Sequence, residues 1–370
     1  MTAQKTVLFV INTMNVGGVE KALLGVINKF LKDNWEVHIG MLKVGGDFLP
    51  YLPKSVIVHS IDGFDEVKPI LHTPLRESAK NYLKKWHIFE AILMLIFYAS
   101  QKISGSSKAL YNYGLKRIPM FSNQEFDLAV AFAGPDAFID TYVSKRIKAK
   151  EKWGWIHFDI TKFGIDKGII QKEYKNYSRI NIVSNDAKDI FDKNFPVLAD
   201  KTAFQPNIVD SDSILTMADE DLNIIKDKNK TIILTVGRIS QEKGQYMALQ
   251  SLKEIVDTGI RNIEWWFVGT GTDYKRCHTY VMENNLSEYV KFYGVQTNPY
   301  PYMKACDIYV QPSLHEGFCI TLAEAKLFKM PIITTDFTGA KEQLTDYPKY
   351  RIIRYSISEM NSALTAFIKA

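Results

Sequence analysis

Two carboxylates stand at the ends of a short segment late in the chain, Glu316-Gly-Phe-Cys-Ile-Thr-Leu-Ala-Glu324. The glycine and the apolar residues that follow predict a loop that runs into a helix from about Thr321. A helix start presents free backbone N–H groups and the positive end of its dipole, and a phosphate suits that place. The two glutamates would then flank a ligand that carries phosphate.

The same residues allow a purely structural interpretation. Thr321-Leu-Ala-Glu324 fits a capping box, in which Glu324 would bond to backbone at the helix start and have no other role. Spacing alone does not choose between a ligand contact and a cap, so both interpretations stay open at this point.

Adjacent glycines follow the first apolar run of the chain. Gly17 and Gly18 come after the predicted strand Thr6–Asn12, where they would let the backbone approach a ligand closely before a helix begins. A Gly-Gly turn between a strand and a helix is also a common structural feature. The loop matches neither a GxGxxG fingerprint nor a P-loop, so it is weak evidence by itself.

A loop of the same kind, with two cations, follows the predicted strand Thr231–Val236. Arg238 could hold a diphosphate through its planar fork and Lys243 as a point charge. The alternative is a solvated turn in which Lys243 lies beside Glu242. Ligands of open α/β sheets bind beyond the carboxyl ends of the strands, which favours a shared diphosphate site for the two cations and the loop after Glu316.

Two further residue groups invite a catalytic or metal-binding interpretation. Asp210-Ser-Asp212 has the spacing of a metal-binding DxD, but it lies in the turn-rich segment Gln205–Ser213, so we expect a hinge there and no metal site. His157, in Trp-Ile-His-Phe-Asp, follows an apolar run, where a lone histidine is more often structural.

The order of apolar runs predicts how these loops are positioned. Runs rich in β-branched residues alternate with amphipathic stretches, which indicates repeated βα units, parallel sheets and an α/β fold. The series restarts after the hinge, so we expect two similar domains, 1–205 and 206–370. The expected strands are Thr6–Asn12, Glu36–Leu42, Asp127–Phe132, Ile180–Val183, Thr231–Val236, Glu264–Val268, Val290–Tyr293, Ile308–Gln311 and Pro331–Thr335, with helices over Val19–Leu31 and near Gln245–Thr258.

Composition narrows the class of protein. The three cysteines of this 370-residue chain form no CxxC pair, so neither a disulfide framework nor a zinc site is expected, and a reducing cytoplasm fits best. Thr6–Asn12 is too short for a signal peptide, and Ile88–Ala99 is too short to span a bilayer. No nucleic-acid recognition module is visible, and we expect no nucleic acid as partner.

The formal charge of +5 is concentrated in one region. Residues 66–118 contain nine basic and three acidic side chains, a local surplus of six. Within this region Ile88–Ala99 has apolar residues at helical spacing. It is either a helix packed on the first domain or an interfacial helix that lies on anionic lipid, which would place the protein on the inner face of the cell membrane.

Considered together, these motifs resemble those of the retaining GT-B glycosyltransferases of family 4, the glycosyl transferases group 1. The resemblance rests on Gly17-Gly18-Val-Glu20, on Gly237-Arg238 with Lys243, and on Glu316 followed by seven residues and Glu324, and it spans roughly Lys5 to Asp346. It implies a GT-B architecture, with two Rossmann-like domains that face each other across a cleft, acceptor-side first and nucleotide-sugar-binding second.

The resemblance also implies roles for single residues. Arg238 and Lys243 would bind the diphosphate, and Glu324 would accept hydrogen bonds from the ribose hydroxyls. Glu316 would face the transferred sugar, and His157 falls where related enzymes place a histidine near that sugar. Further contacts to the donor are expected from the Gly17-Gly18 loop, from the backbone of Val295 to the base, and from the amides of Gly317, Phe318, Cys319 and Ile320.

The expected reaction is transfer of a sugar, with retention, from a nucleotide-sugar to a glycan or lipid-linked acceptor. The donor is expected to be a UDP-sugar, and the pathway bacterial cell-surface polysaccharide synthesis. Cations and oriented amides could stabilise the departing diphosphate without a metal, so no cofactor is expected. The alternatives are a GT-B nucleotide-sugar epimerase and a non-catalytic protein that binds sugar nucleotides.

Overall fold

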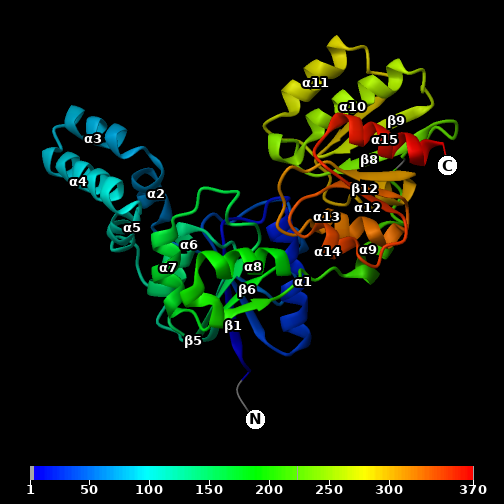
Figure 1. The fold of residues 1–370 in the computed structure, drawn as a ribbon. Coiled ribbons are helices and arrows are strands. Elements are labelled where there is room, and N and C mark those ends of the chain that lie inside the picture. The colour runs from blue at the N-terminus through cyan, green and yellow to red at the C-terminus, as the bar shows by residue number, and fades with distance from the viewer. Residues whose placement is uncertain (1–3, 223, 370) are drawn as a thin grey trace. The chain divides into compact units, whose positions relative to one another are not determined.

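The computed structural model describes residues 4–222 and 224–369 and divides the chain into two compact units. The first unit extends to Pro206 and the second starts at Asn207, except that the short segments Val16–Gly18 and Ser184–Asp186 group with the second unit. Each unit is built on its own parallel β-sheet with helices between successive strands (Figure 1). The predicted α/β class with two parallel sheets is confirmed.

The sheet of the first unit has seven parallel strands in the order β3-β2-β1-β4-β5-β6-β7. The chain changes direction across the sheet between β1 and β4, which makes their carboxyl ends the expected place for a ligand. The strands are β1 (Thr6–Ile11), β2 (Glu36–Met41), β3 (Ile57–Ser60), β4 (Phe126–Ala131), β5 (Ala149–Ile156), β6 (Arg179–Ile182) and β7 (Thr202–Phe204). The helices are α1 (Gly18–Lys32), α2 (Phe64–His72), α3 (Leu75–Lys84), α4 (Ile88–Ser104), α5 (Lys108–Leu115), α6 (Ala137–Arg146), α7 (Lys167–Glu173) and α8 (Asn185–Asn194).

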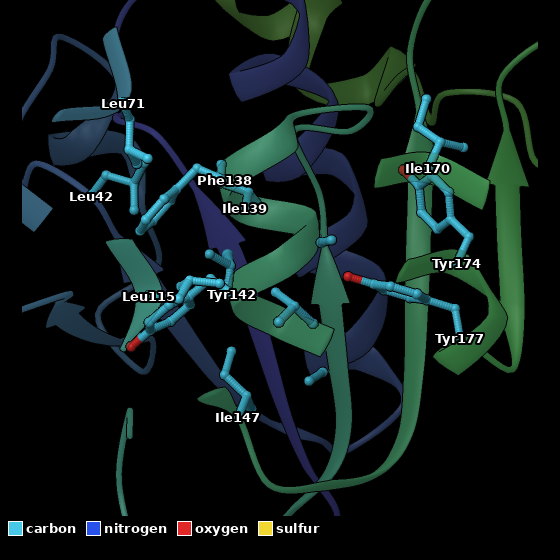
Figure 2. Close-up of a cluster of buried hydrophobic side chains, with 14 of the residues drawn as sticks. Leu42, Leu71, Leu115, Phe138, Ile139, Tyr142, Ile147, Ile170, Tyr174 and Tyr177 are labelled. Atoms are coloured by element: carbon cyan, nitrogen blue, oxygen red, sulfur yellow. The ribbon is translucent and has the colours of Figure 1, made fainter. Parts of the chain in front are cut away.

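Helix α6 lies in the interior of the first unit. Seven consecutive residues of this helix, 138–144, are buried, so it packs on more than one side. Its side chains Phe138 and Tyr142 stack with ring centroids 5.8 Å apart. Figure 2 shows these rings between the leucines of one side and Tyr174 and Tyr177 of the other. The burial of both faces explains why α6 has no amphipathic pattern.

The second unit repeats this arrangement with six parallel strands in the order β10-β9-β8-β11-β12-β13. Here the direction changes between β8 and β11. The strands are β8 (Thr231–Val236), β9 (Ile263–Val268), β10 (Val290–Gly294), β11 (Ile308–Gln311), β12 (Ile332–Thr335) and β13 (Tyr350–Ile353). The helices are α9 (Ser211–Met217), α10 (Gln245–Asp257), α11 (Tyr274–Glu283), α12 (Tyr300–Ala305), α13 (Ile320–Ala325), α14 (Ala340–Leu344) and α15 (Ile357–Ile368).

The segment predicted as a hinge is partly helical. Helix α9 begins at Ser211, because the carboxylate of Asp210 accepts hydrogen bonds from the amide of Ser213 at 3.3 Å and from its hydroxyl at 2.9 Å. Asp210 therefore caps a helix, and Asp212 lies in its first turn. Residues 205–210 are neither helix nor strand, whereas Ser211–Ser213, which were expected to belong to the hinge, are helical.

Within residues 4–222 and 224–369, no helix combines the length and the apolar character needed to cross a membrane.

Candidate functional site

The strands β8, β9 and β10 all end at glycines whose backbone has a positive φ. These are Gly237 at 152°, Gly269 at 139° and Gly294 at 69°. The amide of Gly237 donates to the carbonyl of Val268 at 2.9 Å, and the amide of Gly269 donates to the carbonyl of Gly294 at 2.7 Å. A Cβ atom on Gly269 would lie 2.0 Å from the carbonyl oxygen of Gly237. The carboxyl edge of the sheet is thus formed here by closely packed main chain, as a backbone that approaches a ligand requires.

The loops after β8 and β11, which flank the change of direction, contact each other directly. The amide of Leu314 donates to the carbonyl of Glu242 at 2.8 Å. Gly244 has a φ of 73°, and a Cβ atom there would lie 1.9 Å from the carbonyl oxygen of Pro312. Only glycine fits this contact, which brings the side chains of the two loops together.

Lys243 and Glu316 form an ion pair where these loops meet. Nζ of Lys243 lies 2.5 Å from Oε1 of Glu316, and their side chains are only 22% and 9% exposed. Burial by itself lowers the pKa of Lys243, but the neighbouring Glu316 carboxylate more than offsets it, so that the pKa is raised. The lysine is therefore charged at physiological pH. The hydroxyl of Ser313 also donates to Oε1 of Glu316 at 2.8 Å.

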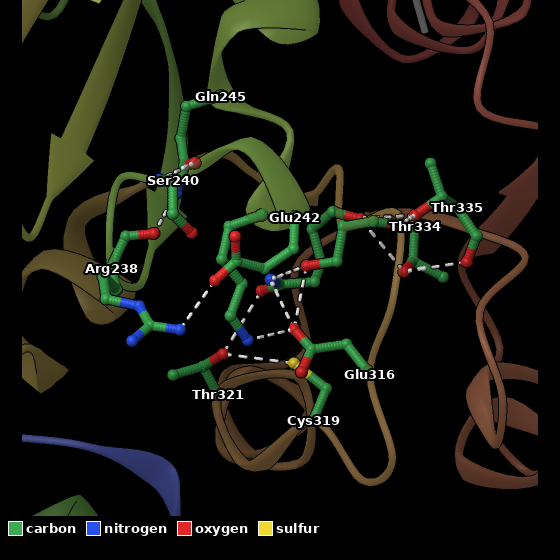
Figure 3. A network of polar contacts seen from close by, with 12 residues as sticks. Arg238, Ser240, Glu242, Gln245, Glu316, Cys319, Thr321, Thr334 and Thr335 are labelled. Carbon is green, nitrogen blue, oxygen red and sulfur yellow. Dashed lines mark hydrogen bonds and ion pairs between the residues drawn. The ribbon is translucent and has the colours of Figure 1, made fainter. Parts of the chain in front are cut away.

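A chain of hydrogen bonds holds the carboxylate end of this pair in place (Figure 3). The hydroxyl of Tyr309 donates to Oε1 of Gln311 at 2.8 Å, and Nε2 of Gln311 donates to the Ser313 hydroxyl at 2.8 Å. The hydroxyl of Thr321, on α13, also donates to Oε1 of Gln311 at 3.2 Å. These bonds connect β11 with α13, so the loop between them is fixed at both ends.

Arg238 is the exposed cation of the loop after β8. Nη2 of its guanidinium lies 2.6 Å from Oε1 of Glu242, and the arginine side chain is 65% exposed. Its backbone is fixed from within, because Nε2 of the buried Gln245 donates to the Arg238 carbonyl at 3.0 Å. The solvated-turn interpretation, which set Lys243 beside Glu242, is wrong, since Glu242 pairs with Arg238 and Lys243 pairs with Glu316.

Glu324 does not form a capping box. Helix α13 begins at Ile320, with Cys319 as its N-cap, and Glu324 is a buried residue inside the helix. Its Oε1 accepts a hydrogen bond from the Tyr300 hydroxyl at 3.0 Å. Burial raises the pKa of Tyr300, and the Glu324 carboxylate raises it further, so the phenol keeps its proton and donates to Glu324. Thr321 lies two residues beyond the N-cap position, which is why the capping pattern does not apply.

The segment between the two glutamates is mostly buried. Gly317, Cys319 and Ile320 are buried, and Phe318 is partly exposed. Burial, followed by the nearby Glu316 carboxylate, raises the pKa of the Cys319 thiol to about 12, so it stays protonated. Its Sγ lies 3.3 Å from the Thr321 hydroxyl. The roles given to the amides of this segment stay predictions.

Val295 directly follows the turn at Gly294 and is 47% exposed. It therefore lies at the same carboxyl edge as the loops after β8 and β11. The structure thus brings together, within one unit, Arg238, Lys243, Val295, Glu316 and the segment up to Glu324.

The glycine pair after β1 does not need glycine for its backbone conformation, and its role in approaching a ligand stays a prediction. Gly17 lies in the loop after β1 and Gly18 begins α1, and neither has a positive φ. The glycine that the backbone requires is Gly46, at φ 115°, where a Cβ atom would lie 2.2 Å from the carbonyl carbon of Met14. Gly45 accepts a hydrogen bond from the Met14 amide at 2.9 Å. The sequence signal for this contact is the second glycine pair, Gly45-Gly46 after β2, which the prediction overlooked.

His157 follows β5 in the first unit, and its ring is held in one orientation. Nε2 lies 2.6 Å from the carbonyl oxygen of Phe132, so Nε2–H donates and Nδ1 is left as an acceptor. Burial lowers the pKa of His157 to about 4. The ring is therefore neutral at physiological pH and suited to hydrogen bonding. The predictions that His157 and Glu316 each lie near the transferred sugar stay predictions.

Across the described ranges, no three His, Cys, Asp or Glu side chains are grouped so that they could hold a metal ion.

Comparison with known proteins gives a family match for part of the chain. Residues 219–370 match the family model of glycosyl transferases group 1. An uncharacterized glycosyltransferase of Methanocaldococcus jannaschii is 30% identical over 208 residues, which is 51% of this chain and 50% of that protein. The N-acetylgalactosamine-N,N'-diacetylbacillosaminyl-diphospho-undecaprenol 4-alpha-N-acetylgalactosaminyltransferase of Campylobacter jejuni is 29% identical, over 42% of this chain and 40% of that protein. The chain thus spans half or less of the length of these relatives.

Solved structures agree on the fold over nearly the whole chain. HepE of Anabaena, solved in complex with UDP, has a TM-score of 0.66 at 17% identity and covers 99% of this chain and 90% of its own. The lipopolysaccharide outer core galactosyltransferase WaaB has a TM-score of 0.60 at 15% identity, with the same coverage of both chains. The family match and these likenesses lead to one conclusion: residues 219–370 are similar to the glycosyl transferases group 1, and the chain has the GT-B fold of the matching structures.

Proposed function

We propose that the protein is a retaining glycosyltransferase, which moves a sugar from a UDP-sugar to a glycan or lipid-linked acceptor of bacterial cell-surface polysaccharide synthesis. The observation that supports this most is the contact between the loops after β8 and β11, which join Lys243 to Glu316 at 2.5 Å beside the exposed Arg238. This contact lies at the change of strand direction, where α/β sheets bind ligands.

The arrangement of charges fits the departure of a diphosphate. Breaking the anomeric C–O bond leaves negative charge on the diphosphate, which preorganised cations and amides stabilise without rearranging. Lys243 is held charged by Glu316, and Arg238 presents its guanidinium to solvent. Two such cations would take the place of a metal ion, so we propose that transfer needs none.

The names of related proteins support the classes of donor and acceptor. HepE was solved with UDP and with UDP-glucose. The Campylobacter jejuni relative is named for a diphospho-undecaprenol acceptor, and a Salmonella typhimurium relative is a lipopolysaccharide 1,6-galactosyltransferase. These names support a UDP-sugar as donor and a lipid-linked glycan as acceptor.

The first experiment is thermal unfolding with UDP-, GDP- and ADP-sugars. A ligand at about 100 times its Kd stabilises the native state by about 2.7 kcal/mol. We expect UDP-sugars to raise the Tm and ADP-sugars to leave it unchanged. A larger rise with GDP- or ADP-sugars would replace UDP as the donor nucleotide, and no rise with any of them would count against nucleotide-sugar binding.

The second experiment is turnover of the stabilising donor, with and without EDTA. We expect transfer to a lipid-linked glycan at equal rates in both. Epimerised sugar formed from donor alone would identify the epimerase alternative, and binding without turnover would identify the non-catalytic one. Activity lost in EDTA and restored by manganese or magnesium would overturn the metal-free proposal.

A further inference from the structure

Helices α3 and α4 form a hairpin in the first unit. They are joined by Lys85-Trp86-His87, and the Tyr82 carbonyl accepts the amides of Lys85 and His87 at 3.0 Å each. Trp86 takes a φ of 60°, which closes the connection tightly. In Figure 1 the hairpin, coloured blue to cyan, extends away from the sheet of its own unit. Most of its surface is therefore free of the apolar core.

One face of α4 packs against its neighbours. Ala91 and Met94 are buried, and Phe97 and Tyr98 pack partly buried on the core of the unit. The rings of Phe97 and Tyr113, on α5, lie 5.1 Å apart. This face confirms the packed-helix interpretation of the segment, but it accounts for only part of its apolar residues.

A second apolar face of α4 has no covering element in the described chain. At about 100° per residue, the exposed apolar side chains of α4 between Ile88 and Ile103 fall within an arc of about 120° that holds no charged side chain. Phe89 is 74% exposed and Ile103 is 88% exposed, and the others are about half exposed. Trp86, at the hairpin tip, is 86% exposed and extends this surface. The members are Ile88, Phe89, Ile92, Leu95, Ile96 and Ile103.

Cations are concentrated on the hairpin that carries this apolar face. Residues 75–104 contain five basic and two acidic side chains. The guanidinium of Arg76, on α3, lies 4.5 Å from the ring centroid of Tyr98, and Nζ of Lys102, on α4, lies 5.8 Å from it, so both cations contact the same ring of α4. Glu90 points to roughly the opposite side of α4 from the apolar face. The exposed lysines of α3 and the connection are Lys80, Lys84 and Lys85.

We propose that this outer face of the α3–α4 hairpin docks on an anionic phospholipid surface. Helix α4 lies in the plane of the interface, with its apolar face among the acyl chains and headgroups and the lysines at the phosphates. Trp86 suits the boundary, where one end of the ring is apolar and the other wet. A second copy of the chain would bring cations against cations, so the charge favours an anionic membrane.

The docking surface is separate from the proposed reaction, and its test measures binding and not turnover. The full chain is sedimented with vesicles of phosphatidylcholine, with and without phosphatidylglycerol, at low and high salt. We expect binding only to vesicles with phosphatidylglycerol, and weaker binding at high salt because salt screens the attraction. Failure of the parent protein to bind at low salt would overturn the proposal.

Two variants separate the contributions. Lys80→Gln, Lys84→Gln and Lys85→Gln together should lower the partition coefficient on the order of 100-fold, at the usual contribution of a cation near an anionic surface. Phe89→Gln, Ile92→Gln and Ile96→Gln together should lower it at least about tenfold, because less apolar area enters the interface. All six side chains are exposed or half-exposed, so unchanged circular dichroism and Tm are expected.

A matched control changes the same charge elsewhere on the first unit. Lys54→Gln, Lys175→Gln and Lys193→Gln together remove three exposed lysines outside the hairpin. Most of the parent's affinity should remain in this variant. If the two triple lysine variants lose vesicle affinity equally, the net charge of the protein and not the hairpin surface would determine binding. A different outcome is that the parent does not bind vesicles but self-associates, and that the apolar variant no longer does. This result would show that a second copy of the chain covers the face.

Discussion

The two units each contain a buried Lys–Glu pair, and the pairs are alike in local geometry. Lys243 and Glu316 lie 2.5 Å apart with side chains 22% and 9% exposed, and Lys145 and Glu173 lie 2.8 Å apart with side chains 29% and 1% exposed. The pairs differ in where they lie. Lys243 and Glu316 are on loops at the carboxyl edge of a sheet, whereas Lys145 and Glu173 are on helices α6 and α7.

The pair in the first unit is part of a packed interior. Asp140, also on α6, is fully buried, and burial followed by the nearby Asp136 raises its pKa well above the usual range. Its Oδ1 accepts a hydrogen bond from the Tyr174 hydroxyl at 3.2 Å. Tyr174 belongs to the buried hydrophobic cluster of the first unit (Figure 2). Buried charge and a shifted pKa therefore do not identify a site by themselves, and position at the strand ends is the better evidence.

The comparison is tested most strongly by Lys243→Met, which removes the buried cation of the second unit. We expect the affinity for UDP to fall about 100-fold, since a hydrogen bond to a charged group contributes about 1.5–3 kcal/mol. Titration calorimetry with UDP measures this.

Its matched control is Lys145→Met. This change leaves Glu173 buried without its cation, which should cost about 3 kcal/mol of unfolding free energy in urea. The affinity of the folded variant for UDP should equal that of the parent. If the two lysine variants lose affinity equally, the distinction between the pairs fails.

Glu324→Gln should give the next largest effect. The amide of Gln can still accept the hydrogen bond from Tyr300, so we expect a nearly unchanged Tm. If the carboxylate binds the ribose hydroxyls, the loss of its charge should lower the transfer rate by tens-fold. Tyr300→Phe is the control, because it removes the hydroxyl and leaves the carboxylate. Full activity in Glu324→Gln would show that the carboxylate has no special role.

Arg238→Gln should lower the affinity for UDP about tenfold, at the low end of charge-assisted contacts. The Arg238–Glu242 pair is largely exposed, so its loss should change the unfolding free energy by less than about 1 kcal/mol. Arg354, which pairs with Glu359 on the surface, gives the matched control Arg354→Gln. A similar loss of UDP affinity in both variants would remove Arg238 from the site.

The smallest effect concerns pH and the first unit. The raised pKa of Asp140 means that the folded state binds its proton more tightly than the unfolded state. Its contribution to stability is therefore present below the unfolded pKa and is lost as pH rises toward the folded value. We expect the Tm of Asp140→Asn, relative to that of the parent, to increase from pH 4.5 to pH 8. A difference independent of pH would mean that Asp140 has an ordinary pKa.

The sequence predicted the central strands better than the edges of the sheets. The expected strands Thr231–Val236 and Ile308–Gln311 agree with β8 and β11 residue by residue, because buried strands appear as continuous apolar runs. β3, β7 and β13 were missed. They are short edge strands, and most of their residues are exposed or half-exposed, so their apolar pattern is weak. β5 was missed because three of its first four residues are charged.

The sequence by itself determined the resemblance to a family, the α/β class and the loops that carry the candidate site, since these depend on residue types and on spacing along the chain. Tertiary structure decided which side chains the site residues contact. Lys243 pairs with Glu316 and not with Glu242, and Tyr300 donates to Glu324, because the fold brings together loops and helices that are remote in sequence. The same holds for α4, whose two apolar faces look alike in sequence, because only the neighbours supplied by the fold bury one and leave the other exposed.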